Sequence, residues 1–136
     1  MSSNLFSDCQ NLKVILKNDV LSKQGSRQGT YQIDQIIVNG KRSWKTATQA
    51  IWFVPEFKDW AIGSLEDIGT TSRGITSVDD KDQRLFDVPN DKWKYHNSDG
   101  EWKIVPIGDV TLKCVATTGT YSLLQNKPTF WGFNLP

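Results

Sequence analysis

The fold class is decided by residues 30–46, which read TYQIDQIIVNGKRSWKT. The first half of this stretch is rich in β-branched residues and begins with Tyr31 and Ile33 on one side of a strand. Asn39-Gly40 follows, a pair that favours a two-residue type I′ turn because both turn positions need a positive φ. The residues after the turn supply a return strand. The stretch therefore predicts a β-hairpin.

Short strand patterns continue on both sides of this hairpin. Further strands are predicted at residues 11–17, 49–54, 58–63, 74–77, 92–96, 101–105 and 110–115. Residues 18–29 form a polar connection, and residues 64–91 form a long surface loop around the short strand at 74–77. No stretch keeps a helical spacing of apolar residues for three turns. We therefore predict an all-β fold, a single antiparallel sandwich or small barrel of about seven to nine short strands.

The length of 136 residues suits one domain. We expect an N-terminal arm at residues 1–8, a β domain at residues 9–116 and a C-terminal tail at residues 117–136 that docks on the domain. The tail contains Phe130-Trp131-Gly132-Phe133, an apolar run that would promote aggregation if it were exposed. Alternatively, the tail binds a partner and forms a homo-oligomer, as in a coat or capsid protein.

Charge and composition exclude several functions. Lys and Arg number 16 against 15 Asp and Glu, so we expect no basic surface for nucleic acid. No apolar run approaches the roughly 18 residues of a membrane span, and residues 1–8 lack the basic segment and apolar core of a signal peptide. The single histidine, His96, lies beside a predicted turn, where exposure is expected rather than a catalytic triad. Cys9, Cys114 and His96 lack the spacing of a zinc site, so we expect no metal and no cofactor.

The two cysteines bracket the predicted domain. Cys9 precedes the first predicted strand and Cys114 lies in the last one. The first and last strands of a β domain are often neighbours, so a disulfide is sterically reasonable, with the two Cα atoms within about 7 Å. The other interpretation is a pair of buried free thiols in a cytosolic protein. The residues alone leave both open.

The chain has six Trp, six Phe and three Tyr, an aromatic content above what a small core requires. Most of these residues should be buried, but Trp44 and Trp102 each follow a hairpin turn, have polar or charged neighbours and are expected to be exposed. An exposed Trp with polar neighbours suits stacking on a sugar or anchoring a protein interface. The predicted ligand-binding residues are Trp44, Trp102, Tyr95, Trp60, Asp79 and Asp80.

Acidic residues cluster in the predicted long loop, at Asp79, Asp80, Asp82, Asp87 and Asp91. Carboxylates on a loop can bind Ca²⁺, which takes six to eight oxygen ligands. The spacing does not match a calcium-binding loop, and Lys81 and Arg84 partly neutralise the cluster. We therefore expect a solvated loop rather than a calcium site.

Several short motifs recur in a familiar order. They are Gly29-Thr30-Tyr31, Asn39-Gly40-Lys41-Arg42, Trp60-Ala61-Ile62-Gly63, Trp93-Lys94-Tyr95 and the closing Cys114. In this order they resemble an extracellular module that occurs in many copies in secreted and adhesion-type invertebrate proteins. The resemblance covers about residues 9–115. Trp44 stands where that module usually has Tyr, and Val88-Pro89 stands where Cys-Pro is common.

The resemblance implies secretion, a Cys9–Cys114 disulfide and a non-catalytic binding role. Together with the aromatic residues it predicts a lectin-like recognition module that binds a glycan or a protein surface through hairpins and the long loop. The location is then extracellular, or cytoplasmic if both thiols are free. The alternatives are a small hydrolase that uses carboxylates such as Asp59, Glu66 or Asp79, and the self-assembling coat protein.

Overall fold

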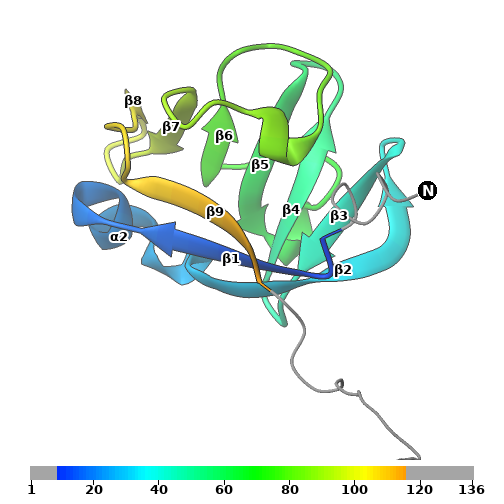
Figure 1. Cartoon of the computed structure of the whole chain (residues 1–136). Coiled ribbons are helices and arrows are strands. Elements are labelled where there is room, and N and C mark those ends of the chain that lie inside the picture. Colours follow the sequence, from blue (N-terminus) through cyan, green and yellow to red (C-terminus); the bar gives the residue numbers. More distant parts are fainter. Residues whose placement is uncertain (1–8, 116–136) are drawn as a thin grey trace, which may run out of the picture.

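A computed structural model describes residues 9–115, which form one curled antiparallel sheet (Figure 1). Within this range the strands are β1 (Asn11–Leu16), β2 (Gly29–Val38), β3 (Lys41–Lys45), β4 (Gln49–Val54), β5 (Asp59–Ser64), β6 (Ile75–Ser77), β7 (Trp93–His96), β8 (Trp102–Ile104) and β9 (Val110–Val115). The predicted all-β antiparallel fold is confirmed, in the form of a half-barrel. The predicted N-terminal arm and the predicted docking of the tail at 117–136 lie outside the described residues.

The strands β8 and β9 are consecutive in the chain but lie at opposite edges of the sheet. The strand order is β8-β7-β6-β5-β4-β3-β2-β1-β9. In a flat sheet these edges would be roughly 38 Å apart, at about 4.8 Å per strand. Residues 105–109 join them and can span only about 20 Å when fully extended. The sheet must therefore curl, and Figure 1 shows β9 returning across the open side of the half-barrel to lie beside β1.

The β2–β3 hairpin forms at the predicted turn. Asn39 has a φ of 54° and Gly40 a φ of 83°, the two positive values that a type I′ turn requires. The strands pair with Ile33 opposite Trp44, and the register shifts between Asp34 and Val38. The turn residues alone were sufficient to predict this connection.

Two segments differ from the sequence prediction. The expected polar connection contains the helix α2 (Asn18–Gln24), followed by the 3-10 turn η1 (Gly25–Arg27). This helix has seven residues, and only Val20 and Gln24 are buried. Because Val20 is its one buried apolar residue, the sequence shows no helical apolar pattern there. The expected long surface loop contains the 3-10 turns η2 (Leu65–Asp67) and η3 (Leu85–Asp87), and Leu85 is buried in the core. No helix among residues 9–115 is long and apolar enough to cross a membrane.

The main core fills the concave side of the sheet and is rich in aromatic rings. Trp44 lies 6.2 Å from Trp60, and Phe53 packs edge-on against Trp60 at 5.5 Å. The buried indole N–H groups have acceptors: Trp44 donates to the Cys9 carbonyl at 2.6 Å and Trp60 to the Gln83 carbonyl at 3.0 Å. Burial of these large rings with their polar atoms paired gives the small domain a dense core.

A smaller apolar cluster lies on the opposite face of the sheet. Its buried members are Ala50, Trp52, Val54 and Ala61. The segment after β5 covers them, because Leu65 and Ile68 pack against this cluster and the Trp52 indole donates to the Thr70 carbonyl at 2.7 Å. Both faces of β4 are therefore buried.

Cys9 and Cys114 form a disulfide that joins the two ends of the domain. Their Cα atoms are 5.8 Å apart, and the linked residues are separated by 105 positions in the sequence. The bridge follows from the pairing of β1 with β9, which places Leu12 opposite Cys114. The expected Cα separation is confirmed.

Candidate functional site

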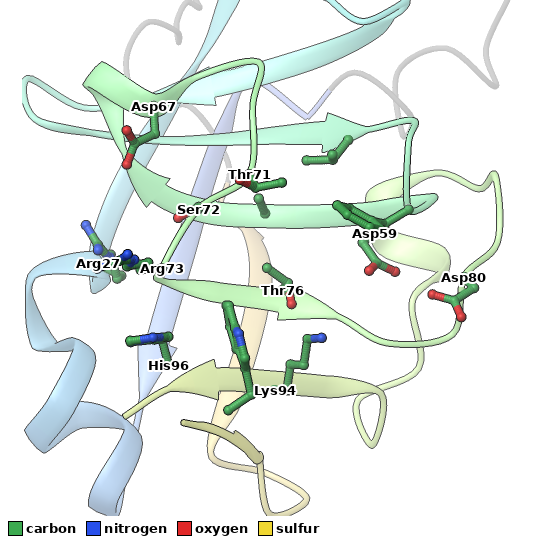
Figure 2. Close-up of a pocket in the computed structure, with 14 residues that line it drawn as sticks. Arg27, Asp59, Asp67, Thr71, Ser72, Arg73, Thr76, Asp80, Lys94 and His96 are labelled. Atoms are coloured by element: carbon green, nitrogen blue, oxygen red, sulfur yellow. The ribbon is translucent and has the colours of Figure 1, made fainter. Parts of the chain in front are cut away.

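A pocket of about 630 Å³ lies on the outer face of the sheet, over β5 to β8 (Figure 2). Its lining residues are Arg27, Val54, Phe57, Asp59, Ala61, Asp67, Thr71, Ser72, Arg73, Thr76, Asp80, Lys94, His96 and Trp102. Most of them carry polar or charged side chains. They come from the sheet, from η1 and from the segments before and after β6.

Strand alternation explains how the sheet supplies both a core and a pocket. Trp60 and Ile62 of β5 point into the core, so their neighbours Asp59 and Ala61 point to the outer face. In the same way β6 gives Thr76 to the pocket. On the next two strands, the lining residues are Lys94 and His96 of β7 and Trp102 of β8, which pairs with His96.

Glycines allow the segment that ends in β6 to pack closely on the sheet at one end of the pocket. A Cβ at Gly63 would lie 1.9 Å from Ser72 Oγ, and one at Gly74 would lie 2.1 Å from the Ile62 carbonyl oxygen. Neither position has room for a larger residue. This close packing holds Thr71, Ser72 and Arg73 against β5, where they line the pocket.

Trp102 forms an aromatic wall of the pocket. Its side chain is 40% exposed, the Lys94 ammonium lies 4.9 Å from the centre of its ring, and the His96 ring meets it edge-on at 5.2 Å. These contacts hold the indole in place, since Lys94 and Trp102 are joined by a cation–π interaction.

Two carboxylates, Asp59 and Asp80, lie at the end of the pocket away from Arg27. Asp59 is 9% exposed, and its Oδ1 atom has no hydrogen-bond partner among the described residues. Burial, and then the neighbouring Asp80 through its charge and a side-chain hydrogen bond, raise the pKa of Asp59 to about 6, while the Lys94 ammonium acts in the opposite direction. Figure 2 shows Asp59, Thr76 and Lys94 pointing toward a common point on this face.

The helix α2 positions the basic end of the pocket. Gln24 is buried, and its amide donates to the carbonyl oxygens of Arg73 at 3.1 Å and His96 at 2.7 Å. The Arg27 guanidinium donates to Gln24 Oε1 at 3.0 Å and also to Gln49 Oε1. Burial lowers the pKa of Arg27, against the attraction of Tyr31 and Asp67. Gln24 therefore links three pocket residues that are distant in sequence.

The structure brings two of the predicted ligand-binding residues to the pocket, Trp102 and Asp80. Asp79 does not line it, and its carboxylate accepts a hydrogen bond from Gln83 at 2.7 Å. Trp60 and Tyr95 are buried in the core, and the Tyr95 hydroxyl donates to Asp19 of α2. Neither ring can contact a ligand at the surface.

The expected exposure of Trp44 is wrong, because this residue is only 2% exposed. It lies between Ile33 and Ile51 on the core side of the sheet. The expected exposure of His96 is only partial, since the side chain is half-buried and lines the pocket.

Sequence reasoning missed most of the pocket, including Arg27, Thr76, Lys94 and the loop residues 71–73. The one available signal was the alternation of side chains along a strand. It places Thr76 and Lys94 on the face of the sheet opposite to the one that carries their buried neighbours. Among residues 9–115, no group of three or more His, Cys, Asp or Glu side chains is arranged to hold a metal ion.

The sequence significantly matches no protein-family model and no curated protein, and the fold significantly matches no solved structure. The pocket's own chemistry is therefore the basis for a functional proposal.

Proposed function

We propose that this protein is a recognition module that binds a carbohydrate in the pocket over β5 to β8. The observation that carries the proposal is the exposed indole of Trp102 beside a cavity lined mainly by hydrogen-bonding side chains. A sugar ring has an apolar face of C–H groups and an edge of hydroxyl groups. The pocket offers a partner for each, which favours a glycan over a protein surface as the ligand.

The size and charge of the pocket also support a glycan. A volume of about 630 Å³ falls within the roughly 300–1,000 Å³ of small-molecule sites. The cations Arg27, Arg73 and Lys94 are balanced by Asp59, Asp67 and Asp80. A strongly charged ligand would be repelled by one of the two sets, whereas a polar ligand of low net charge can be hydrogen-bonded by both.

We further propose that the protein works outside the cell. The Cys9–Cys114 disulfide supports this location, because such bridges form and persist in oxidising compartments. Glycans displayed on cell surfaces are present in the same compartment.

A glycan array tests the proposal with the unmodified protein and the variant Trp102→Ala. We expect saturable binding to a subset of glycans and a loss of about two- to tenfold in affinity for the variant, since an aromatic contact contributes about 0.5–1.5 kcal/mol beyond its buried area. Phe86→Ala is the matched control, because Phe86 is 38% exposed and does not line the pocket. Equal binding by all three proteins would contradict the proposed site.

A second candidate function is favoured by one observation, the interacting carboxyl groups of Asp59 and Asp80. A carboxyl group with a pKa of about 6 in a pocket can act as a general acid near neutral pH. We propose glycoside hydrolysis as this alternative. Turnover of chromogenic nitrophenyl glycosides that Asp59→Asn abolishes and Asp91→Asn preserves would support it. Saturable glycan binding without turnover would exclude it.

A further inference from the structure

Two buried polar atoms in the pocket have no hydrogen-bond partner among the described residues. They are Asp59 Oδ1 and Thr76 Oγ1, and each residue is only 9% exposed. An unpaired buried polar group destabilises the folded state, so native structures keep few of them. Both of these residues line the same pocket. A ligand that hydrogen-bonds to both would remove this cost.

The two atoms belong to one small area of the sheet. Thr76 of β6 pairs with Ala61 of β5 on one side and with Lys94 of β7 on the other. Asp59 lies two residues before Ala61 and therefore on the same face. Figure 2 shows the side chains of Asp59, Thr76 and Lys94 directed toward one another, with Asp80 beside them.

The charges in this area determine which ligand group fits. Asp59 faces the carboxylate of Asp80 and the ammonium of Lys94. An anionic group would be repelled by the two carboxylates, and a cationic group would compete with Lys94. A neutral hydroxyl group fits, because it can donate to a carboxylate and accept from an ammonium or from the Thr76 hydroxyl.

We propose that Asp59, Thr76, Asp80 and Lys94 form a subsite that binds two adjacent hydroxyl groups of a neutral sugar. One hydroxyl donates to Asp59 Oδ1, and the next one pairs with Thr76 Oγ1 and the Lys94 ammonium. The same Lys94 lies over the Trp102 ring at 4.9 Å, so the sugar's apolar face can meet the indole while its hydroxyl edge enters the subsite. This inference rests on the proposed carbohydrate-binding function.

The test uses calorimetric titration of the full chain with a panel of methyl glycosides of neutral hexoses. For the glycoside that binds, Asp59→Asn should weaken affinity about tenfold or more, because its hydrogen bond includes a charged group. Thr76→Val should weaken affinity about two- to tenfold, the loss expected for a neutral hydrogen bond. Thr111→Val and Asp91→Asn are matched controls outside the pocket and should change affinity less than about twofold. Removing the hydroxyl that pairs with Thr76 should weaken binding to Thr76→Val less than it weakens binding to the unmodified protein, because the variant has already lost one of that hydroxyl's two contacts.

A second measurement needs no ligand. Because the Thr76 hydroxyl has no partner in the described structure, Thr76→Val should melt at or above the temperature of the unmodified protein. A clear loss of melting temperature relative to Thr111→Val would show that the hydroxyl already has a protein partner and would overturn the subsite. Unchanged glycoside affinity in Thr76→Val and Asp59→Asn would overturn the subsite alone. Failure of the unmodified protein to bind any glycoside would overturn the proposed function together with the subsite.

Discussion

At the scale of single residues, Trp44 and Trp102 show that polar neighbours do not reveal exposure. Both follow a hairpin turn, and both lie between polar or charged residues. In a strand, each core residue has neighbours that point to the other face, so charged neighbours surround buried and exposed residues equally. The two residues differ in exposure because Trp44 belongs to β3, which lies inside the sheet, whereas Trp102 belongs to β8, which forms an edge.

This difference predicts that the same substitution lowers the free energy of unfolding much more at Trp44 than at Trp102. Trp44→Phe removes the indole N–H that donates to the Cys9 carbonyl and should lower the free energy of unfolding by about 1–3 kcal/mol, with a further loss for the cavity. Trp102→Phe should lower it by less than about 0.5 kcal/mol. Urea denaturation followed by far-ultraviolet circular dichroism measures both. Similar losses for the two variants would contradict the buried position of Trp44.

Asp59 should make stability depend on pH. The pKa of Asp59 is raised to about 6 in the folded protein, above the usual value of 3.8 for an aspartate side chain, so the folded state binds this proton more tightly than the unfolded state. The stabilisation is full below pH ~4 and is lost as the pH rises through about 6. Asp59→Asn should therefore gain stability relative to the unmodified protein between pH 4.5 and 7.5.

The difference in unfolding free energy between the unmodified protein and Asp59→Asn isolates the contribution of Asp59. Burial is the largest single influence on the pKa of Asp34 and raises it, but Lys45 and backbone hydrogen bonds together lower it. The contact with Lys41 lowers the pKa of Asp82. Their opposite pH dependence is common to both proteins and cancels in the difference. Asp91→Asn is the matched control. An unfolding free-energy difference that does not change between pH 4.5 and 7.5 would rule out the raised pKa.

At the scale of elements, α2 matters more for the pocket than its length suggests. Gln24 is the last residue of this seven-residue helix, yet it binds the backbone of Arg73 and His96 and the side chain of Arg27. The pocket's basic end thus depends on a segment that does not belong to the sheet.

Substitution of Gln24 tests this dependence. Gln24→Met keeps the length of the side chain but removes the donor to two carbonyl oxygens and the acceptor of the Arg27 Nε–H, while Arg27 keeps its bond to Gln49. We expect a loss of about 1–3 kcal/mol in the free energy of unfolding and weaker glycan binding. Gln32→Met is the control, because Gln32 is exposed on β2. Equal stability of the two variants would contradict the linking role of Gln24.

Elements with a local signal were predictable, and the others were not. The turn at Asn39-Gly40 and the alternation in β1 and β9 depend only on neighbouring residues, so the hairpin and the strands could be predicted. Helix α2 buries only Val20 and Gln24, which leaves no pattern to detect. Leu85 enters the core from an irregular segment for which no periodicity exists.

At the scale of the whole molecule, the curl of the sheet determines the site. The pocket combines Arg27, Asp59, Thr76 and Trp102, which come from four separate segments. Their proximity depends on strand order and on the packing of η1 against the outer face. Neither can be predicted from residues that are close together in the sequence. Trp102 and Asp80 were predicted because an aromatic residue near a turn and an acidic loop are visible locally.

The disulfide holds this curl together, because it ties the segment before β1 to the edge strand β9. It closes a loop over a separation of 105 residues, for which the loss of chain entropy in the unfolded state corresponds to about 4.7 kcal/mol. Cys114→Ala should therefore destabilise the domain by roughly 2–5 kcal/mol in urea denaturation. Cys9 is buried, so Cys9→Ala should lose slightly more because it also leaves a small cavity.

The double variant separates the bridge from its two side chains. Both single changes remove the same covalent link, so Cys9→Ala combined with Cys114→Ala should be no less stable than Cys9→Ala alone. Reduction of the unmodified protein should produce a loss of similar size, and the unreduced protein should show no reactive thiol in denaturant. Additive losses in the double variant, or two titratable thiols before reduction, would mean that the cysteines act as separate core residues. The stability of the half-barrel would then have to come from the β1–β9 pairing without a covalent constraint.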